Sequence, residues 1–199
     1  MLTKEEAKKL VEIEGKVRGA VFQTDAEYIK NKYGEEGLNK VKYELKKLGY
    51  PIEYEKIKAM EWRPLGLRAL SLIVFKNIFN WKDKDIKLMG NAAPKYSFII
   101  KLLMKFFISI EEAFKHSPEY WEKHYNIGKL EIVELNEEDK YAILKIKDFK
   151  VHPAYCKYLE GYLQRIFEFI LPDEKVIVKE NKCIFKGDDF HEFKGDWSN

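Results

Sequence analysis

The sequence predicts an α+β fold, in which N-terminal helices pack with a C-terminal antiparallel sheet. Apolar residues recur at helical spacing up to about residue 124, and apolar and charged residues then alternate along 129–135 and 141–146. Another helical stretch and another alternating stretch follow, which gives the order strand-strand-helix-strand-strand. Because 46% of the 199 residues are hydrophobic and 15% aromatic, the chain can bury one core. We therefore expect a single domain over residues 1–199, with 1–14 as an N-terminal helical extension.

Glycines, prolines and capping residues divide the first part of the chain. Thr3 and Glu6 form a capping-box pattern, which predicts a short helix that ends by Gly15. The segment KVRGAVF at 16–22 is typical of a strand. The spacing of apolar residues then predicts further helices over 24–33, 37–48, 65–79, 85–89, 94–107 and 109–116, with one more short helix beginning at Pro118.

The last part of the chain changes from one period to another. An amphipathic helix is predicted from Tyr155 to Ile170, ending before Pro172. After it, apolar residues alternate with charged ones from 176 to 185. This alternation predicts a hairpin with its turn near Asn181-Lys182.

Composition favours a cytoplasmic protein without a nucleic-acid partner. The net charge of +3 is the difference between 36 basic and 33 acidic residues spread along the chain, which gives no argument for binding nucleic acid or an anionic membrane. Two cysteines and no recognisable signal peptide indicate a reducing compartment and free thiols. The longest apolar run, at 96–110, is interrupted by Lys101 and Lys105, so no membrane span is expected.

Short motifs near the C-terminus carry a family resemblance. Cys156 is followed by LEGYL at 159–163, KENKC at 179–183, Gly187-Asp188 and FHEF at 190–193. This series resembles the C-terminal half of 4-vinyl-reductase-type domains, which share a ligand-binding fold with haem NO-binding domains and Golgi-transport subunits. The resemblance implies that fold here. The first half of the chain also resembles this fold, because it has pairs of predicted helices and a break in the helical pattern near Gly90.

The resemblance also points to a metal site. The family pattern has three cysteines; Cys156 and Cys183 match the first two, and His191 stands at the place of the third. His152 is a possible fourth ligand, because residues four apart share a helix face, although Pro153 favours an extended His152. Thiolate and imidazole groups suit tetrahedral zinc. The alternative is that both cysteines are ordinary buried apolar residues.

Haem is a weaker hypothesis. His116 and His124 lie before the strands, roughly where haem NO-binding domains place their iron ligand. Those domains hold the haem propionates with a Tyr-x-Ser-x-Arg motif, but the comparable segment here, 144–150, has neither the serine nor the arginine. Its lysines lack the bidentate fork of arginine. A surface or capping role for both histidines is therefore favoured over iron ligation.

An apolar ligand pocket is the third hypothesis. The helices predicted at 65–79, 94–107 and 155–169 could enclose a mostly apolar cavity with tyrosine hydroxyl groups inside it. The alternative is a filled core. The candidate ligand-binding residues are Tyr96, Ile100, Leu103, Phe107, Tyr155, Tyr158 and Tyr162.

No sequence signature supports catalysis, so a non-enzymatic role is favoured. Motifs such as GxSxG, a P-loop, GxGxxG and HExxH are missing, and His152 is the only local base for a Cys156 nucleophile. We expect a sensor or binding domain for a small apolar molecule that relays occupancy to a partner, and the resemblance implies a possible homodimer. The alternatives are a zinc-binding or tetrapyrrole-associated domain, and a scaffold subunit with a filled core. The cofactor is left unidentified, with zinc as the candidate.

Overall fold

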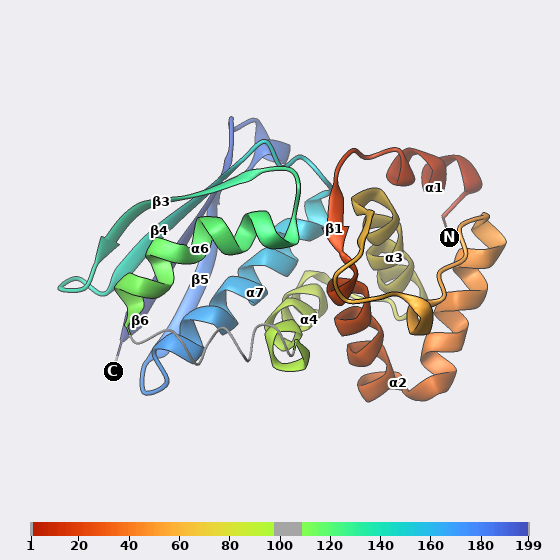
Figure 1. The fold of residues 1–199 in the computed structure, drawn as a ribbon, viewed down its shortest axis with the longest axis horizontal. Helices are drawn as coiled ribbons and strands as arrows, with labels where there is room; N and C mark the ends of the chain where they lie inside the picture. The colour runs from red at the N-terminus through yellow and green to blue at the C-terminus, as the bar shows by residue number, and fades with distance from the viewer. Residues whose placement is uncertain (1, 98–108, 199) are drawn as a thin grey trace.

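The structure is a computed structural model that describes residues 2–97 and 109–198. A mainly helical half comes first along the chain, and a half built on a four-stranded sheet follows it (Figure 1). The helical half consists of α1 (Lys4–Val11), β1 (Lys16–Arg18), α2 (Gly19–Leu48), η1 (Tyr54–Lys56), β2 (Trp62–Pro64), α3 (Leu65–Ile78) and α4 (Asp83–Tyr96). The second half consists of α6 (Ile110–His124), β3 (Lys129–Asn136), β4 (Tyr141–Lys147), α7 (Pro153–Ile170), β5 (Lys175–Lys182), η2 (Ile184–Lys186) and β6 (His191–Ser198).

The sheet confirms the predicted α+β class and the order strand-strand-helix-strand-strand. Its strands run β3-β4-β6-β5, and every neighbouring pair is antiparallel. Helices α6 and α7 lie over one face, where α6 contacts β3 and α7 contacts β5 and β6 (Figure 1). Leu144, Ile146, Val178 and Phe193 are buried on that face, as period-two alternation requires.

Helices α4 and α7 join the two halves through a very close approach. A Cβ atom on Gly90 would lie 2.0 Å from the Tyr158 carbonyl oxygen, and one on Gly161 would lie 1.9 Å from that of Lys87. Gly90 was predicted to end a helix at Met89, and this prediction was wrong. Gly90 lies inside α4, because only a residue without a side chain lets the two backbones meet here.

The strand predicted at 16–22 is shorter than expected. Strand β1 ends at Arg18, and Val21 and Phe22 belong to α2. The N–H groups of Gly19 and Ala20 donate to the carbonyl groups of Glu61 and Ala59, 2.8 Å away in each case, so a neighbouring loop satisfies the first turn of the helix. Helix α2 also joins the two predicted helices 24–33 and 37–48 across a kink at Gly34, whose φ is 70°.

Proline does not end the helix predicted at 109–116. Helix α6 continues through Pro118 to His124. Pro118 has no N–H to bond to the carbonyl group of Phe114, four residues earlier, and the Ser117 hydroxyl donates to that oxygen instead, at 2.8 Å. The side chain beside the proline thus replaces the missing hydrogen bond.

The predicted turn at Asn181-Lys182 was also wrong. Strand β5 continues through Lys182, and the chain then passes through η2 and the left-handed Gly187 before β6 returns at His191. The Cys183 N–H donates to the Asp188 carboxylate at 2.7 Å, which fixes this longer connection. Cys183 therefore lies in the connection rather than in the returning strand.

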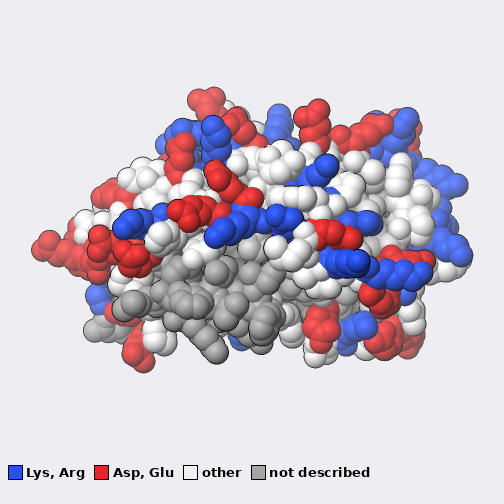
Figure 2. All heavy atoms as spheres, in the orientation of Figure 1, with Lys and Arg blue, Asp and Glu red and all other residues white. Residues whose placement is uncertain are grey.

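No helix in the part of the chain that the structure describes is long and apolar enough to cross a membrane. Basic and acidic side chains are interspersed over much of the face that Figure 2 shows.

Candidate functional site

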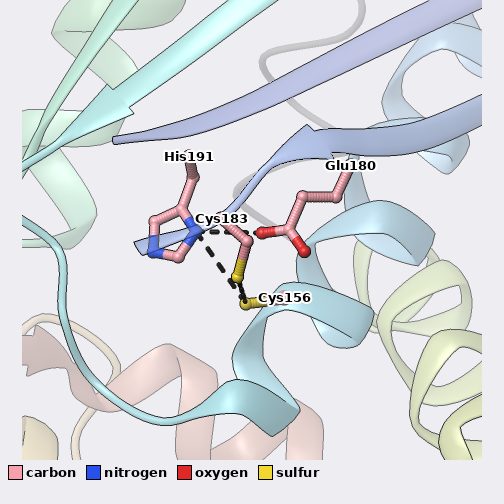
Figure 3. A group of neighbouring side chains, drawn as sticks. All are labelled: Cys156, Glu180, Cys183 and His191. Atoms are coloured by element: carbon pink, nitrogen blue, oxygen red, sulfur yellow. Dashed lines mark hydrogen bonds and ion pairs between the residues drawn. The ribbon is translucent and has the colours of Figure 1, made fainter. Parts of the chain in front are cut away.

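Four side chains from four segments of the chain converge beside the first turns of α7. Cys156 comes from α7, Glu180 from β5, Cys183 from the connection after β5, and His191 from the start of β6 (Figure 3). One potential ligand atom from each lies within 4.8 Å of those of the others. We call these four residues the thiol cluster.

A bulge in β5 makes this convergence possible. The pairing of β5 with β6 shifts register between Glu180 and Lys182. Without the shift, residues 180 and 183 would face opposite sides of the sheet, because side chains alternate along a strand. With it, the Glu180 side chain is 2% exposed and Cys183 is 3% exposed, and both lie on the inner side with Cys156.

The hydrogen bonds of the thiol cluster leave its ligand atoms facing one another. The Cys156 Sγ lies 3.5 Å from the Cys183 Sγ and 3.9 Å from the His191 Nδ1. The same Nδ1 lies 2.9 Å from a Glu180 carboxylate oxygen, while His191 Nε2 lies 3.1 Å from the Phe149 carbonyl oxygen. A carbonyl group fixing the second ring nitrogen is the usual arrangement of a metal-binding histidine.

Burial and charge act on the ionisable groups of the thiol cluster. Burial raises the pKa of the Cys156 thiol, and the neighbouring Glu180 carboxylate raises it further. Burial alone would raise the pKa of Glu180, but hydrogen bonds from His191 and from the two thiols outweigh it and lower that pKa. An ionised Glu180 carboxylate thus lies beside the protonated Cys156 thiol.

The distances match a tetrahedral metal site. Zinc–sulfur bonds of ~2.3 Å in a tetrahedron separate two sulfur atoms by about 3.8 Å, and a sulfur from a nitrogen by about 3.6 Å. The corresponding distances here are 3.5 and 3.9 Å. The four groups can therefore hold a zinc ion with only small movements of their side chains.

His152 does not join the thiol cluster. It has an extended backbone and caps α7, because its Nδ1 accepts the N–H of Ala154 at 3.1 Å. Pro153 occupies the first helical turn, and this keeps His152 outside the helix. Glu180 takes the fourth position instead. The sequence held a signal for it, since Val176, Val178 and Glu180 share one strand face, but the bulge that brings Cys183 to the same side was not predictable.

A second feature is a cavity of about 130 Å³ between α6 and α7, which we call the α6–α7 cavity. Its wall is almost entirely apolar. Side chains from α2, α6, β3 and α7 form it, chiefly Val21, Ala113, Trp121, Leu130, Leu159 and Leu163.

The residues predicted to bind a ligand are only partly gathered at this cavity. Tyr158 and Tyr162 line it. Tyr155 lies outside the wall, buried against Phe149 with ring centroids 5.9 Å apart, and Tyr96 is 38% exposed at the end of α4. The remaining three, Ile100, Leu103 and Phe107, lie outside the described residues. Among the described residues, α6 lines the cavity together with α7, and no residue of α3 does. Most of the helix predicted at 94–107 lies outside the described residues.

Polar groups on the cavity wall include three without a hydrogen-bonding partner among the described residues. They are His124 Nε2 and the hydroxyl groups of Tyr158 and Tyr162. His124 Nδ1 lies 2.9 Å from the Tyr120 carbonyl oxygen and must donate to it, so a neutral ring leaves Nε2 as an acceptor. Burial lowers the pKa of His124, which favours that neutral ring.

A buried ion pair borders the cavity on the side of the helical half. Arg68 on α3 donates two hydrogen bonds to Asp25 on α2, at 3.0 and 3.2 Å, and a third to the Tyr125 hydroxyl at 3.1 Å. Its guanidinium also lies 4.4 Å from the centre of the Tyr158 ring. Tyr125 and Tyr158 both line the cavity. Their contacts with Arg68 therefore connect the cavity wall to the helical half.

Comparisons with solved structures confirm the predicted haem NO-binding-like fold. An H-NOX protein from S. oneidensis in the Fe(II)NO state is 13% identical with a TM-score of 0.70, over 92% of this chain and 99% of that one. An oxygen-binding H-NOX domain related to soluble guanylate cyclases is 13% identical with a TM-score of 0.65, over 92% and 95%. Unliganded H-NOX from K. algicida is 13% identical with a TM-score of 0.62, over 92% and 97%.

No family model and no curated protein matches the sequence. The chain therefore has the H-NOX fold, and identities this low establish the fold alone.

The residues that the structure describes do not fit a haem group. A cavity of about 130 Å³ is far smaller than a tetrapyrrole, since pockets for drug-sized ligands measure roughly 300–1,000 Å³. His116 lies near Glu112 and Glu119 on the outer surface of α6, and only His124 reaches the cavity. Lys147 pairs with Glu131 at 2.8 Å, and Lys145 lies 3.6 Å from the Phe190 ring, so neither lysine of β4 faces the cavity.

Proposed function

We propose that this protein is a sensor domain that binds a small apolar molecule in the α6–α7 cavity and uses the H-NOX fold without haem. The observation that carries the proposal is the cavity itself. An engineered apolar cavity of about 150 Å³ stays dry and binds benzene or xenon. A cavity of about 130 Å³ with an apolar wall belongs to the same class.

The polar groups on the cavity wall that lack a partner in the described part of the chain define the occupant further. His124 Nε2 can accept one hydrogen bond, and the hydroxyl groups of Tyr158 and Tyr162 can donate or accept. The described residues that line the cavity include no lysine or arginine, so none of them would neutralise a carboxylate as a permanent cation. The occupant we propose is a neutral molecule of about the size of benzene, with at most one polar group.

The contacts around Arg68 supply a route from occupancy to a response. An occupant that displaces the Tyr158 ring changes the contact of that ring with the Arg68 guanidinium, which is anchored to α2 through Asp25. Such a displacement alters how the helical half packs against α7. A partner that binds the helical half would then respond to the ligand.

Benzene tests the proposal, with unfolding temperature as the readout. The wild-type protein should be stabilised in proportion to the benzene concentration, since a ligand that binds only the folded state raises its stability. Ala113→Leu fills the cavity from α6 and should abolish the shift. If benzene did not change the unfolding temperature of the wild-type protein, the proposal would be contradicted. An intense absorption band at the blue edge of the visible, after haem is supplied to the expressing cells, would show instead that the protein binds haem.

A scaffold subunit with a filled core is less well supported, because the cavity is not filled. The homodimer implied by the resemblance remains a prediction, which sedimentation at micromolar concentration tests directly. A monomer of 23.7 kDa at that concentration would remove it.

Zinc binding at the thiol cluster is a second candidate function, favoured by two sulfur atoms, an imidazole and a carboxylate at tetrahedral distances. The ion would hold α7 to β5 and β6 and thereby fix one wall of the ligand site. Protein purified without chelator should contain about one zinc per chain. Cys183→Ala should lose that zinc, and wild-type protein that takes up none after zinc addition would contradict the assignment.

A further inference from the structure

A fifth side chain, the carboxylate of Glu160, borders the thiol cluster without offering it a ligand atom. Glu160 lies on α7 one turn after Cys156, and it is 6% exposed. It is not among the four residues whose ligand atoms converge. A buried carboxylate in this position needs a role, because burying a charge is costly unless it is paired and hydrogen-bonded.

Glu160 holds the backbone at the point where β5 bulges. Its Oε1 accepts the backbone N–H of Glu180 at 3.2 Å. Glu180 is the last paired residue before the register shift, and the shift is what turns Glu180 and Cys183 to the same side. The carboxylate of Glu160 therefore fixes the backbone of one proposed zinc ligand directly and supports the geometry that aims another.

Two lysines keep Glu160 in this position. Lys157 donates to its Oε1 at 2.5 Å, and Lys87 on α4 lies 3.7 Å from its Oε2. Lys87 also donates to the carbonyl group of Val178 on β5 at 2.9 Å. The lysines balance the charge of Glu160, and Lys87 fastens α4 to the same stretch of β5 that the carboxylate holds.

We propose that Glu160 is a positioning residue for the metal centre, which sets zinc affinity by holding Glu180 and the β5 bulge in the ligating arrangement. The inference rests on the proposed zinc binding. Groups that orient metal ligands from outside typically change metal affinity by about 10–100-fold when they are removed.

The experiment compares zinc affinities of full-length variants by competition with a chelator. Glu160→Ala removes the acceptor and should weaken zinc binding by about 10–100-fold. Glu160→Gln keeps an oxygen that can accept the Glu180 N–H, and its affinity should stay closer to that of the wild type. Glu168→Ala is the matched control on the same helix, because Glu168 pairs with Arg165 and has no contact with the thiol cluster. Its zinc affinity should not change.

The visible spectrum of the cobalt-substituted protein is the second readout, because it reports ligand geometry rather than fold stability. It should change in Glu160→Ala and not in Glu168→Ala. Should Glu160→Ala fail to fold, Lys87→Met decides, since it removes the support for Glu160 from α4 and should also weaken zinc binding. Wild-type zinc affinity in folded Glu160→Ala, or in Lys87→Met if Glu160→Ala does not fold, would overturn the inference. A wild-type protein that binds no zinc overturns the metal assignment together with it.

Discussion

Two buried polar groupings lie against the first turns of α7, and they differ in kind. Arg68 and Asp25 are complementary: the cation supplies donors, the carboxylate accepts two of them, and each side chain is 1% exposed. The thiol cluster brings together atoms that all act as metal ligands once deprotonated. Burial raises the pKa of Asp25, and the charge of Arg68 opposes that rise. The charges of the first grouping therefore balance each other without a further ion. For the second grouping, we propose that a bound cation supplies the balancing charge.

Removing one partner of the buried ion pair should give the largest loss of stability. Asp25→Ala leaves the Arg68 charge buried without its partner, which we expect to lower the free energy of unfolding by about 3–5 kcal/mol. Glu5→Ala, in an exposed ion pair with Lys9, should change it by less than ~1 kcal/mol. Urea unfolding of both variants measures the difference. Equal losses in the two variants would show that Arg68 and Asp25 stabilise the fold no more than an exposed ion pair does.

Supplying the cation should stabilise the second grouping. Zinc at 100 times its dissociation constant should raise the free energy of unfolding by about 2.7 kcal/mol, because it binds the folded state. In Cys183→Ala most of that gain should disappear. Calorimetry with zinc and with a chelator gives both values. If zinc did not change the stability of the wild-type protein, Cys156 and Cys183 would be ordinary buried cysteines.

Two tyrosines that contact Arg68 separate hydrogen bonding from packing. Tyr125→Phe removes an acceptor from a buried guanidinium and should cost about 1–3 kcal/mol. In Tyr158→Phe the ring that stacks on the guanidinium remains, so the loss should be below ~0.5 kcal/mol. The order of the two urea midpoints checks this, and a larger loss for Tyr158→Phe would show that its hydroxyl has a partner.

Acid should produce the smallest effect. Burial lowers the pKa of His124 and of His152, so the folded protein binds protons there more weakly than the unfolded chain does. These groups therefore do not reduce stability well above pH ~6.5, and they reduce it as the pH falls below that value. Urea midpoints of metal-free protein at several pH values measure the slope. His124→Gln should flatten it, and an unchanged slope would contradict the assignment of His124.

The sequence predicted the sheet half better than the helical half, for physical reasons. Alternation over 129–135 and 141–146 fixed two strands, since a strand covered on one face must alternate. The helix boundaries predicted at Gly90 and at Pro118 were wrong. A close approach to α7 accounts for the glycine inside α4, and a hydrogen bond within α6, from the Ser117 hydroxyl, compensates for Pro118. The local sequence carries no sign of the approach of α7 to Gly90.

Only part of the candidate site was predictable from the sequence. The convergence of Cys156, Cys183 and His191 was anticipated through a family resemblance, and the structure places these residues together. Glu180 and Glu160 were missed, because a bulge and a contact between α7 and β5 determine their roles. The cavity needed the structure, since an apolar helix face has the same pattern whether the space before it is filled or empty.

The most direct test of the sensor proposal is a crystal of the metal-loaded protein pressurised with xenon. Xenon reports apolar cavities that are open to small molecules. The proposal predicts a xenon atom between α6 and α7, next to Ala113 and Leu163, and none at that place in Ala113→Leu. A wild-type crystal without xenon between these helices would contradict the claim that the protein holds an apolar ligand there.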